Sequence, residues 1–125
     1  MSTATENRTE VKTLDDELNR QIQSGAILEA FERFYADDVV MQENTDQPKV
    51  GKETCRQAER AVLDAIEEFH GVRLLGSAVN GDTSYSEWEF DATYKGAARV
   101  KVAQVAARRW KNGQIVHERF YYHKG

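Results

Sequence analysis

The sequence predicts an α+β fold, in which three helices and one short strand precede a strongly curved, mainly antiparallel sheet. Two observations carry this prediction. In the first half of the chain, apolar residues recur at steps of three and four, which is the spacing of one-faced helices, whereas in the second half they alternate. Short segments rich in Asn and Gly separate the alternating stretches, as in antiparallel hairpins.

Length and composition indicate one domain. The chain has 125 residues, of which 40% are hydrophobic and 30% charged. This is long enough to form one hydrophobic core and short for two. We expect this domain over residues 9–125, after a flexible polar terminus over residues 1–8. The net charge of −4 argues against a nucleic-acid partner. No apolar run approaches the roughly 18 residues of a membrane span, and no signal peptide is visible, so we expect a cytoplasmic protein without a membrane partner.

Cysteine and histidine usage gives no indication of a metal. Cys55 is the only cysteine, and the three histidines lack the spacing of a helical ligand pair. We expect a buried structural cysteine, with a reactive thiol as the less favoured alternative, and neither metal nor cofactor.

Three apolar stripes predict the helices. The first ends at Ser24-Gly25 and the second begins directly afterwards. The third follows Gly51 and ends at His70-Gly71. The stripes consist of Val11, Leu14, Leu18 and Ile22; then Ile27, Ala30, Phe31 and Phe34; then Cys55, Ala58, Val62, Ala65, Ile66 and Phe69.

A short strand follows the second helix, because the apolar period changes from helical to extended around Asp37-Asp38. Along this strand Val39, Met41 and Glu43 share one face. Two apolar side chains and a carboxylate therefore point into the same space. This makes Glu43 the strongest single candidate for a functional residue.

Four more strands are predicted over residues 72–79, 83–94, 98–110 and 114–122. A three-residue turn at 95–97 would place Asp91 opposite Lys101 and Thr93 opposite Arg99, so that opposite charges meet. The same alternation puts Val100, Val102, Gln104 and Ala106 on the apolar face, followed by Arg108 and Trp110 unless a bulge intervenes. In the last strand, either the face of Glu118, Phe120 and Tyr122 or that of His117, Arg119 and Tyr121 could turn inward.

The candidate catalytic residues are Glu43 and Glu118. Burial among apolar side chains raises the pKa of a carboxyl group toward the range useful for proton transfer. The alternatives are a solvated rim position for Glu43 and an ion pair with an arginine for Glu118. The candidate ligand-binding residues are aromatic, apolar or hydrogen-bonding side chains on the same faces: Tyr35, Met41, Trp88, Phe90, Gln104, Arg108, Trp110, Phe120 and Tyr122.

Three motifs in order resemble the nuclear transport factor 2-like (NTF2-like) superfamily, specifically its SnoaL-like and ketosteroid-isomerase-like branch. They are FYADDVVMQE, then Gly51 with its helix, then WKNGQIVHERFYY, and the resemblance extends over residues 10–123. It implies a cone, in which three helices close one side of a bent sheet around an apolar cavity and the outer sheet face forms dimers. Aromatic residues on both faces of the last strand also favour a homodimer.

The resemblance places Glu43 where the isomerases keep their catalytic base. Leu18, and Val105 or Ala106, stand at the positions of their oxyanion donors, and Phe120 replaces the aspartate of the epoxide hydrolases. The expected function is binding of a small apolar molecule in the cavity, with isomerase, cyclase or dehydratase chemistry by Glu43 if the protein is an enzyme. The alternative is a non-catalytic ligand-binding or protein-interaction dimer module.

Overall fold

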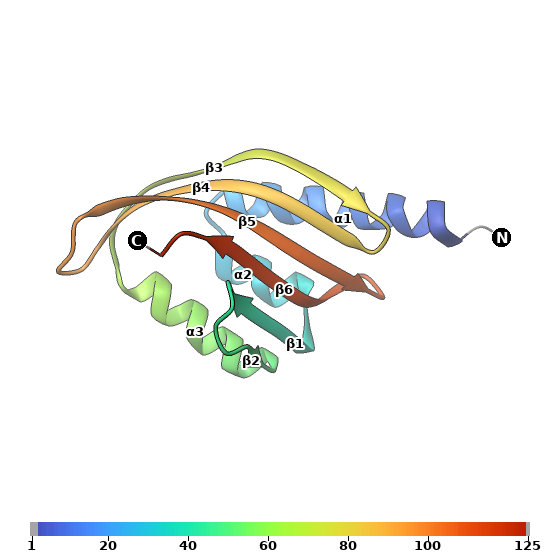
Figure 1. Cartoon of the computed structure of the whole chain (residues 1–125), viewed down its shortest axis with the longest axis horizontal. Coiled ribbons are helices and arrows are strands. Elements are labelled where there is room, and N and C mark those ends of the chain that lie inside the picture. Colours follow the sequence, from blue (N-terminus) through green and yellow to red (C-terminus); the bar gives the residue numbers. More distant parts are fainter. Residues whose placement is uncertain (1–2, 125) are drawn as a thin grey trace.

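The structure, a computed structural model, describes residues 3–124, and their side chains from Glu10 onward. Three helices and a six-stranded sheet make up this part of the chain (Figure 1). The helices are α1 (Thr3–Gln23), α2 (Ile27–Phe34) and α3 (Lys52–Asp64). The strands are β1 (Tyr35–Glu43), β2 (Lys49–Val50), β3 (Ile66–Asn80), β4 (Thr83–Tyr94), β5 (Arg99–Lys111) and β6 (Gln114–Tyr122). The predicted α+β class is therefore confirmed.

The sheet has the strand order β2-β1-β6-β5-β4-β3. All neighbours are antiparallel except β1 and β6, which run parallel. The predicted register of the β4–β5 hairpin is confirmed, with Asp91 opposite Lys101 and Thr93 opposite Arg99. Arg99 also forms an ion pair with Asp91 at 2.7 Å.

The sheet is bent along its length, with α1 and α2 behind it and α3 beside β1 and β2 (Figure 1). Irregular pairing contributes to this bend, because a bulge turns a strand sharply and increases its twist. The register of β3 against β4 shifts at three points, and that of β5 against β6 shifts between Arg109 and Trp110. The result is a concave face that the helices cover.

The third helix is shorter than predicted. It ends at Asp64, and Ile66 already begins β3, so the expected continuation of the helix to Phe69 is wrong. Ile66 lies opposite Tyr94 and Phe69 lies opposite Ala92 in the sheet. Pairing with β4 thus outweighs a helical spacing of apolar residues that extends only one turn beyond Asp64.

The first helix is longer than its apolar stripe predicts, because its backbone is helical from Thr3. Expected flexibility over residues 1–8 falls partly on Met1 and Ser2, which lie outside the described residues. None of the helices described is long and apolar enough to cross a membrane.

The core lies between the helices and the sheet. Leu18, Phe34, Val39 and Ile115 are fully buried there. Trp110 packs edge-on against Phe34, with ring centroids 6.2 Å apart. The helical layer is therefore fixed to the sheet at one end, which leaves space between them at the other.

Candidate functional site

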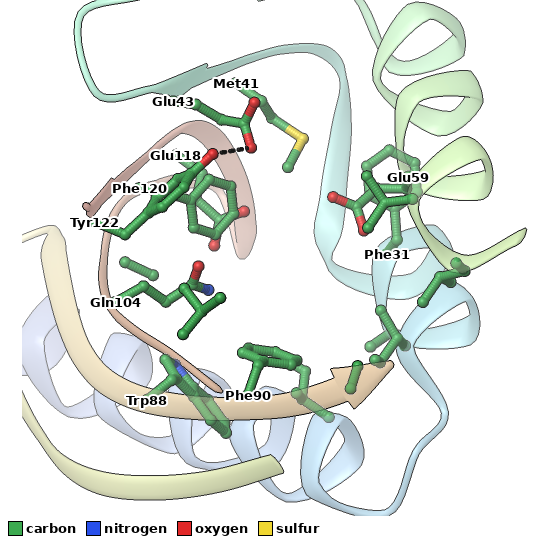
Figure 2. A pocket seen from close by; sticks show the side chains of 18 of the residues that line it. Phe31, Met41, Glu43, Glu59, Trp88, Phe90, Gln104, Glu118, Phe120 and Tyr122 are labelled. Atoms are coloured by element: carbon green, nitrogen blue, oxygen red, sulfur yellow. Dashed lines mark hydrogen bonds between the residues drawn. The ribbon is translucent and has the colours of Figure 1, made fainter. Parts of the chain in front are cut away.

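A cavity of about 550 Å³ lies between the helices and the concave face of the sheet. Side chains from every helix and every strand except β2 line it, and most of them are apolar (Figure 2). Val62 and Phe69 line the cavity although 49% and 43% of their surface is exposed. The cavity therefore opens between the end of α3 and the start of β3, through an apolar rim.

The structure brings all but one of the predicted site residues together on the cavity wall. Those that line it are Tyr35, Met41, Glu43, Trp88, Phe90, Gln104, Arg108, Glu118, Phe120 and Tyr122. The inward face of β6 is thus the one that carries Glu118, Phe120 and Tyr122.

Trp110 is the exception, and its predicted place on the cavity wall is wrong. Trp110 stays on the inward face with Ala106 and Arg108, but it lies beyond the end of the cavity, where its side chain is part of the core. Its indole Nε1–H donates a hydrogen bond to Ser84 Oγ at 2.9 Å. The alternation predicted its inward direction correctly, but a sequence pattern does not show where along the sheet the cavity ends.

Glu43 lies at the end of β1, half-buried, with its carboxyl group directed into the cavity (Figure 2). The hydroxyl of Tyr122 donates a hydrogen bond to Glu43 Oε1 at 2.8 Å. Burial and the hydrogen bond to Glu43 raise the pKa of Tyr122 to about 12. Tyr122 therefore stays protonated at neutral pH and remains a donor.

Asn44 fixes this pair in place. Its backbone has a positive φ of 51°, the left-handed conformation that Asn tolerates. Its side-chain Oδ1 accepts a hydrogen bond from the backbone N–H of Tyr122 at 2.9 Å. The loop after β1 is thereby tied to the end of β6, and the side chains of Glu43 and Tyr122 keep their relative positions.

A buried polar network forms one side of the cavity wall. Arg108 on β5 donates through Nε to Glu118 Oε2 at 2.8 Å and through Nη1 to Asp15 Oδ1 at 2.8 Å. Tyr35 donates its hydroxyl proton to the other oxygen of Glu118. Arg108, Glu118 and Asp15 each expose 2% of their surface or less. The alternative of an arginine partner for Glu118 is thus the one found.

Electrostatics determine the charge states of Arg108 and Tyr35 in this network. Burial opposes the charge of Arg108, but the charges of Glu118 and Asp15 outweigh it and raise the pKa of the guanidinium above its usual value. Burial and the nearby charge of Glu118 raise the pKa of Tyr35 well above its ordinary value. Arg108 is therefore charged and Tyr35 neutral at any working pH.

Sequence reasoning missed the outer members of this network. Asp15 and Asn19 lie on α1, where Arg108 Nη1 also donates to Asn19 Oδ1 at 2.7 Å. Ser84 donates to Asp15 Oδ1 at 2.7 Å. Asp15 does carry a signal, since it stands four residues after Val11 and three before Leu18, inside an apolar stripe. A polar residue at such a position indicates a buried partner.

Glu59 was also missed, and it carries the same signal, four residues after Cys55 and three before Val62. It is half-buried, and its carboxyl group points into the cavity from α3 (Figure 2). Among the described residues, no hydrogen bond or ion pair satisfies it. Burial, followed by the charges of Glu118 and Glu43, raises the pKa of Glu59 to about 7.

The charged residues on the cavity wall are Glu43, Glu59, Glu118 and Arg108. Because Arg108 is matched by Glu118, the excess charge is negative. Within residues 3–124, no group of three or more His, Cys, Asp and Glu side chains is arranged to hold a metal ion.

A helical layer on the concave face of a bent sheet, enclosing an apolar cavity with a few acidic groups, defines a domain of the NTF2-like fold. Solved structures support this class. A candidate SnoaL-like polyketide cyclase from Mesorhizobium loti is 31% identical, with a TM-score of 0.83 over 90% of this chain and 98% of that one. The sequence profile of the SnoaL-like domain matches residues 9–122, and this chain belongs to that family.

Two other solved structures share the fold at lower identity. One is an LEH-like epoxide hydrolase from Mycobacterium tuberculosis, 16% identical, with a TM-score of 0.73 over 93% of this chain and 84% of that one. The other, from Catenulispora acidiphila, has a ketosteroid isomerase-like fold and was solved with trimethylamine. It is 19% identical, with a TM-score of 0.71 over 83% of this chain and 81% of that one. No curated protein matches this chain.

The resemblance found in the sequence is therefore confirmed at the level of family and fold. Of the positions that correspond to the isomerases' oxyanion donors, Leu18 and Ala106 line the cavity with apolar side chains, whereas Val105 is exposed. Phe120 also lines it. These positions supply no polar group, so any chemistry must use other residues.

Proposed function

We propose that this protein binds a small, uncharged, mainly apolar molecule in the cavity and moves a proton on it, with Glu43 as the general base. The reactions that fit are isomerisation, cyclisation and dehydration. The observation that carries the proposal is the Glu43 carboxylate inside an apolar cavity, held by the protonated hydroxyl of Tyr122.

The geometry leaves Glu43 able to accept a proton. Tyr122 hydrogen-bonds to Oε1, whereas Oε2 has no hydrogen bond among the described residues. Met41 and Phe120 stand beside it on the wall and limit the approach of water (Figure 2). A positioned base with little surrounding water is effective because proton transfer depends on geometry first and pKa second.

Gln104 is suited to position the substrate. It faces the cavity from β5, between Trp88 on β4 and Tyr122 on β6, and its amide makes no hydrogen bond to the described residues. An amide N–H can bind a carbonyl oxygen and stabilise the negative charge that forms there when a neighbouring C–H proton is removed. Gln104 would then take the role that Leu18 and Ala106 cannot fill.

The charges on the wall restrict the ligand class. With Glu43, Glu59 and Glu118 set against one arginine, an anionic ligand would be repelled, whereas neutral molecules would be accepted. The candidate polyketide cyclase and the epoxide hydrolase among the similar structures are in keeping with a cavity that takes small organic molecules.

The test uses two probes that do not require the natural substrate. Nile red, a neutral dye, should bind in the cavity and gain fluorescence. The protein should also catalyse ring opening of 5-nitrobenzisoxazole, in which a base removes one C–H proton. Glu43→Gln should lower this rate by about 100-fold or more, which is the lower range for a positioned general base, and leave dye binding intact.

Glu53→Gln is the matched control, because Glu53 is exposed on α3 and absent from the cavity wall. It should retain the full rate. An unchanged rate in Glu43→Gln would remove Glu43 from the mechanism. Dye binding without any ring opening by the native protein would instead support the alternative, a non-catalytic ligand-binding domain, which the apolar lining of the cavity also fits.

We also propose that two copies pair through the outer face of the sheet. Val105 on β5 and Tyr121 on β6 lie opposite each other on that face, with 37% and 46% of their surface exposed. The same face carries acidic residues on β4, such as Glu87 and Glu89, and basic residues on β5, such as Lys101. A two-fold pairing can set the acidic strip of one copy against the basic strip of the other.

A further inference from the structure

We propose that Glu59 is a second catalytic residue, a general acid that delivers a proton to the bound molecule from α3 while Glu43 removes one from β1. This inference rests on the proposed proton transfer by Glu43, and it assigns a function to an acidic side chain that the sequence pattern did not single out.

The position of Glu59 fits this role. The cavity is lined by Glu59 from the helical layer and by Glu43 from the sheet, so a ligand between them meets a carboxyl group on two different walls (Figure 2). Glu59 also stands one turn before Val62, which forms part of the cavity's exposed apolar rim. Water at the rim can therefore restore its proton after each reaction.

The fold treats Glu59 differently from its structural acids. Asp15 and Glu118 are each held by Arg108 at 2.8 Å, as expected for buried carboxylates that only support the structure. Glu59 has neither a hydrogen bond nor an ion pair within residues 3–124. A half-buried carboxyl group that faces a cavity without a partner is available to a ligand.

The surrounding charges keep a proton on Glu59 near neutral pH. Burial is the largest cause of its raised pKa, followed by the negative charges of Glu118 on β6 and Glu43 on β1. Lys49 on β2 acts in the opposite direction but does not cancel them. Because its pKa is about 7, Glu59 is present in both the acid and the ionised form at neutral pH.

The remaining titratable neighbours do not change this balance. Tyr35 interacts electrostatically with Glu59, and its own raised pKa keeps it neutral. Cys55, one turn earlier on α3, is buried and has a raised pKa, so it is a neutral thiol. Glu59 and Glu43 are thus the two carboxyl groups on the wall without an arginine partner.

The two residues together complete a balanced reaction. In a dehydration, Glu43 takes a proton from a C–H group, the released electron pair forms the C=C bond, and the adjacent C–O bond breaks. The leaving oxygen takes the proton of Glu59 and departs as water. Glu43 is then protonated and Glu59 ionised, and exchange with solvent at the rim restores both.

The experiment compares two benzisoxazoles that differ in their need for an acid. In both, the base removes the C–H proton, a nitrile forms, the N–O bond breaks, and a phenolate oxygen is released. The oxygen of the nitro compound is a good leaving group, whereas that of unsubstituted benzisoxazole gains more from protonation. Glu59→Gln should therefore lower the rate of ring opening of the unsubstituted compound about tenfold or more, and that of the nitro compound much less.

A pH profile gives a second readout. With the native protein, turnover of unsubstituted benzisoxazole should fall as the pH rises above about 7, where Glu59 loses its proton, and this fall should be absent in Glu59→Gln. Glu53→Gln, an exposed position on the same helix, should behave like the native protein on both compounds. The Glu59 side-chain carboxyl, followed by ¹³C NMR and assigned with Glu59→Gln, should titrate near neutral pH.

Several outcomes would overturn the proposal. Equal slowing of both compounds in Glu59→Gln would indicate a structural role, and titration of Glu59 near the ordinary range of a glutamate would remove the proton that it is to deliver. If Glu43→Gln abolishes turnover while Glu59→Gln changes nothing, only the role of Glu59 fails. If the native protein turns over neither compound although both displace Nile red, the proposed function fails together with the role of Glu59.

Discussion

At the scale of single residues, the cavity contains carboxyl groups in three different settings. Glu118 is bound by Arg108 and Tyr35, Glu43 is held by one tyrosine hydroxyl, and Glu59 has no partner among the residues that the structure describes. Because the partners of an acid influence whether it keeps or releases a proton, these three residues are suited to different roles.

The free energy of unfolding should respond to Glu59. Its pKa is about 7 in the folded protein against 4.5 for an ordinary glutamate, so the native state binds more protons than the unfolded state between these values. The native protein therefore loses stability as the pH rises through this window. The glutamine of the Glu59→Gln variant cannot ionise. The free energy of unfolding of this variant should therefore exceed that of the native protein by on the order of 1–3 kcal/mol at pH 8, and by almost nothing at pH 4.

Urea unfolding at the two pH values measures this difference, and Glu53→Gln serves as the control. If the difference in stability between Glu59→Gln and the native protein is the same at both pH values, the pKa of Glu59 is not raised in the folded protein.

At the scale of elements, the Arg108 network ties α1 to β4, β5 and β6. Asp15 supplies the contact from the helix, where it accepts hydrogen bonds from Arg108 and Ser84. The covering helix is therefore attached to the sheet by polar contacts at the cavity wall and by apolar packing away from it. Loss of these contacts would weaken the packing of α1 over the cavity.

Asp15→Ala should destabilise the fold by about 3 kcal/mol, because it leaves part of a buried guanidinium unmatched. Asp16→Ala is a close control, since the neighbouring residue pairs with exposed Lys12 at the surface and such pairs contribute at most about 1 kcal/mol. Urea unfolding followed by the fluorescence of the buried tryptophans would show both effects. Similar losses in the two variants would contradict the structural role of the network.

The sequence predicted most elements, and its errors have physical causes. Alternation and turn residues predicted the β4–β5 register correctly, because opposite charges and apolar faces agree on one pairing. The end of α3 was misplaced, since Ile66 and Phe69 fit a helical stripe and a strand equally well. Only the partner strand β4 decides between the two, and a local pattern does not contain it.

The candidate site was predictable where the strand alternation is regular. Glu43, Glu118 and Tyr122 follow from which face of a strand turns inward. Trp110 does point inward, but it lies in the core beyond the end of the cavity, which strand alternation does not locate. Glu59 was not predicted, because it lies on a helix and strand alternation carries no information about it. A polar residue within a helical apolar stripe is the pattern that would have found it.

At the scale of the whole molecule, the two faces of the sheet differ in their chemistry. The concave face encloses the cavity, and the outer face carries exposed apolar residues between oppositely charged strips. Pairing through the outer face would leave the cavity free in each copy, so that binding and assembly do not compete.

Val105→Glu and Tyr121→Glu should convert a dimer into a monomer, because each places a charge in the centre of the proposed interface. Sedimentation velocity would measure the change in mass. Gln57→Glu, on an exposed residue of α3 in the helical layer, should leave the assembly unaltered. A native protein that sediments as a monomer would contradict the pairing.

The separation between the arginine network and the apolar lining has an evolutionary consequence. Ionic contacts among a few residues connect the helical layer to the sheet, and most of the remaining lining consists of apolar side chains. Substitutions among these apolar side chains can change the shape of the cavity without breaking the ionic contacts that hold the helices on the sheet. A scaffold organised in this way can acquire new substrates one lining residue at a time.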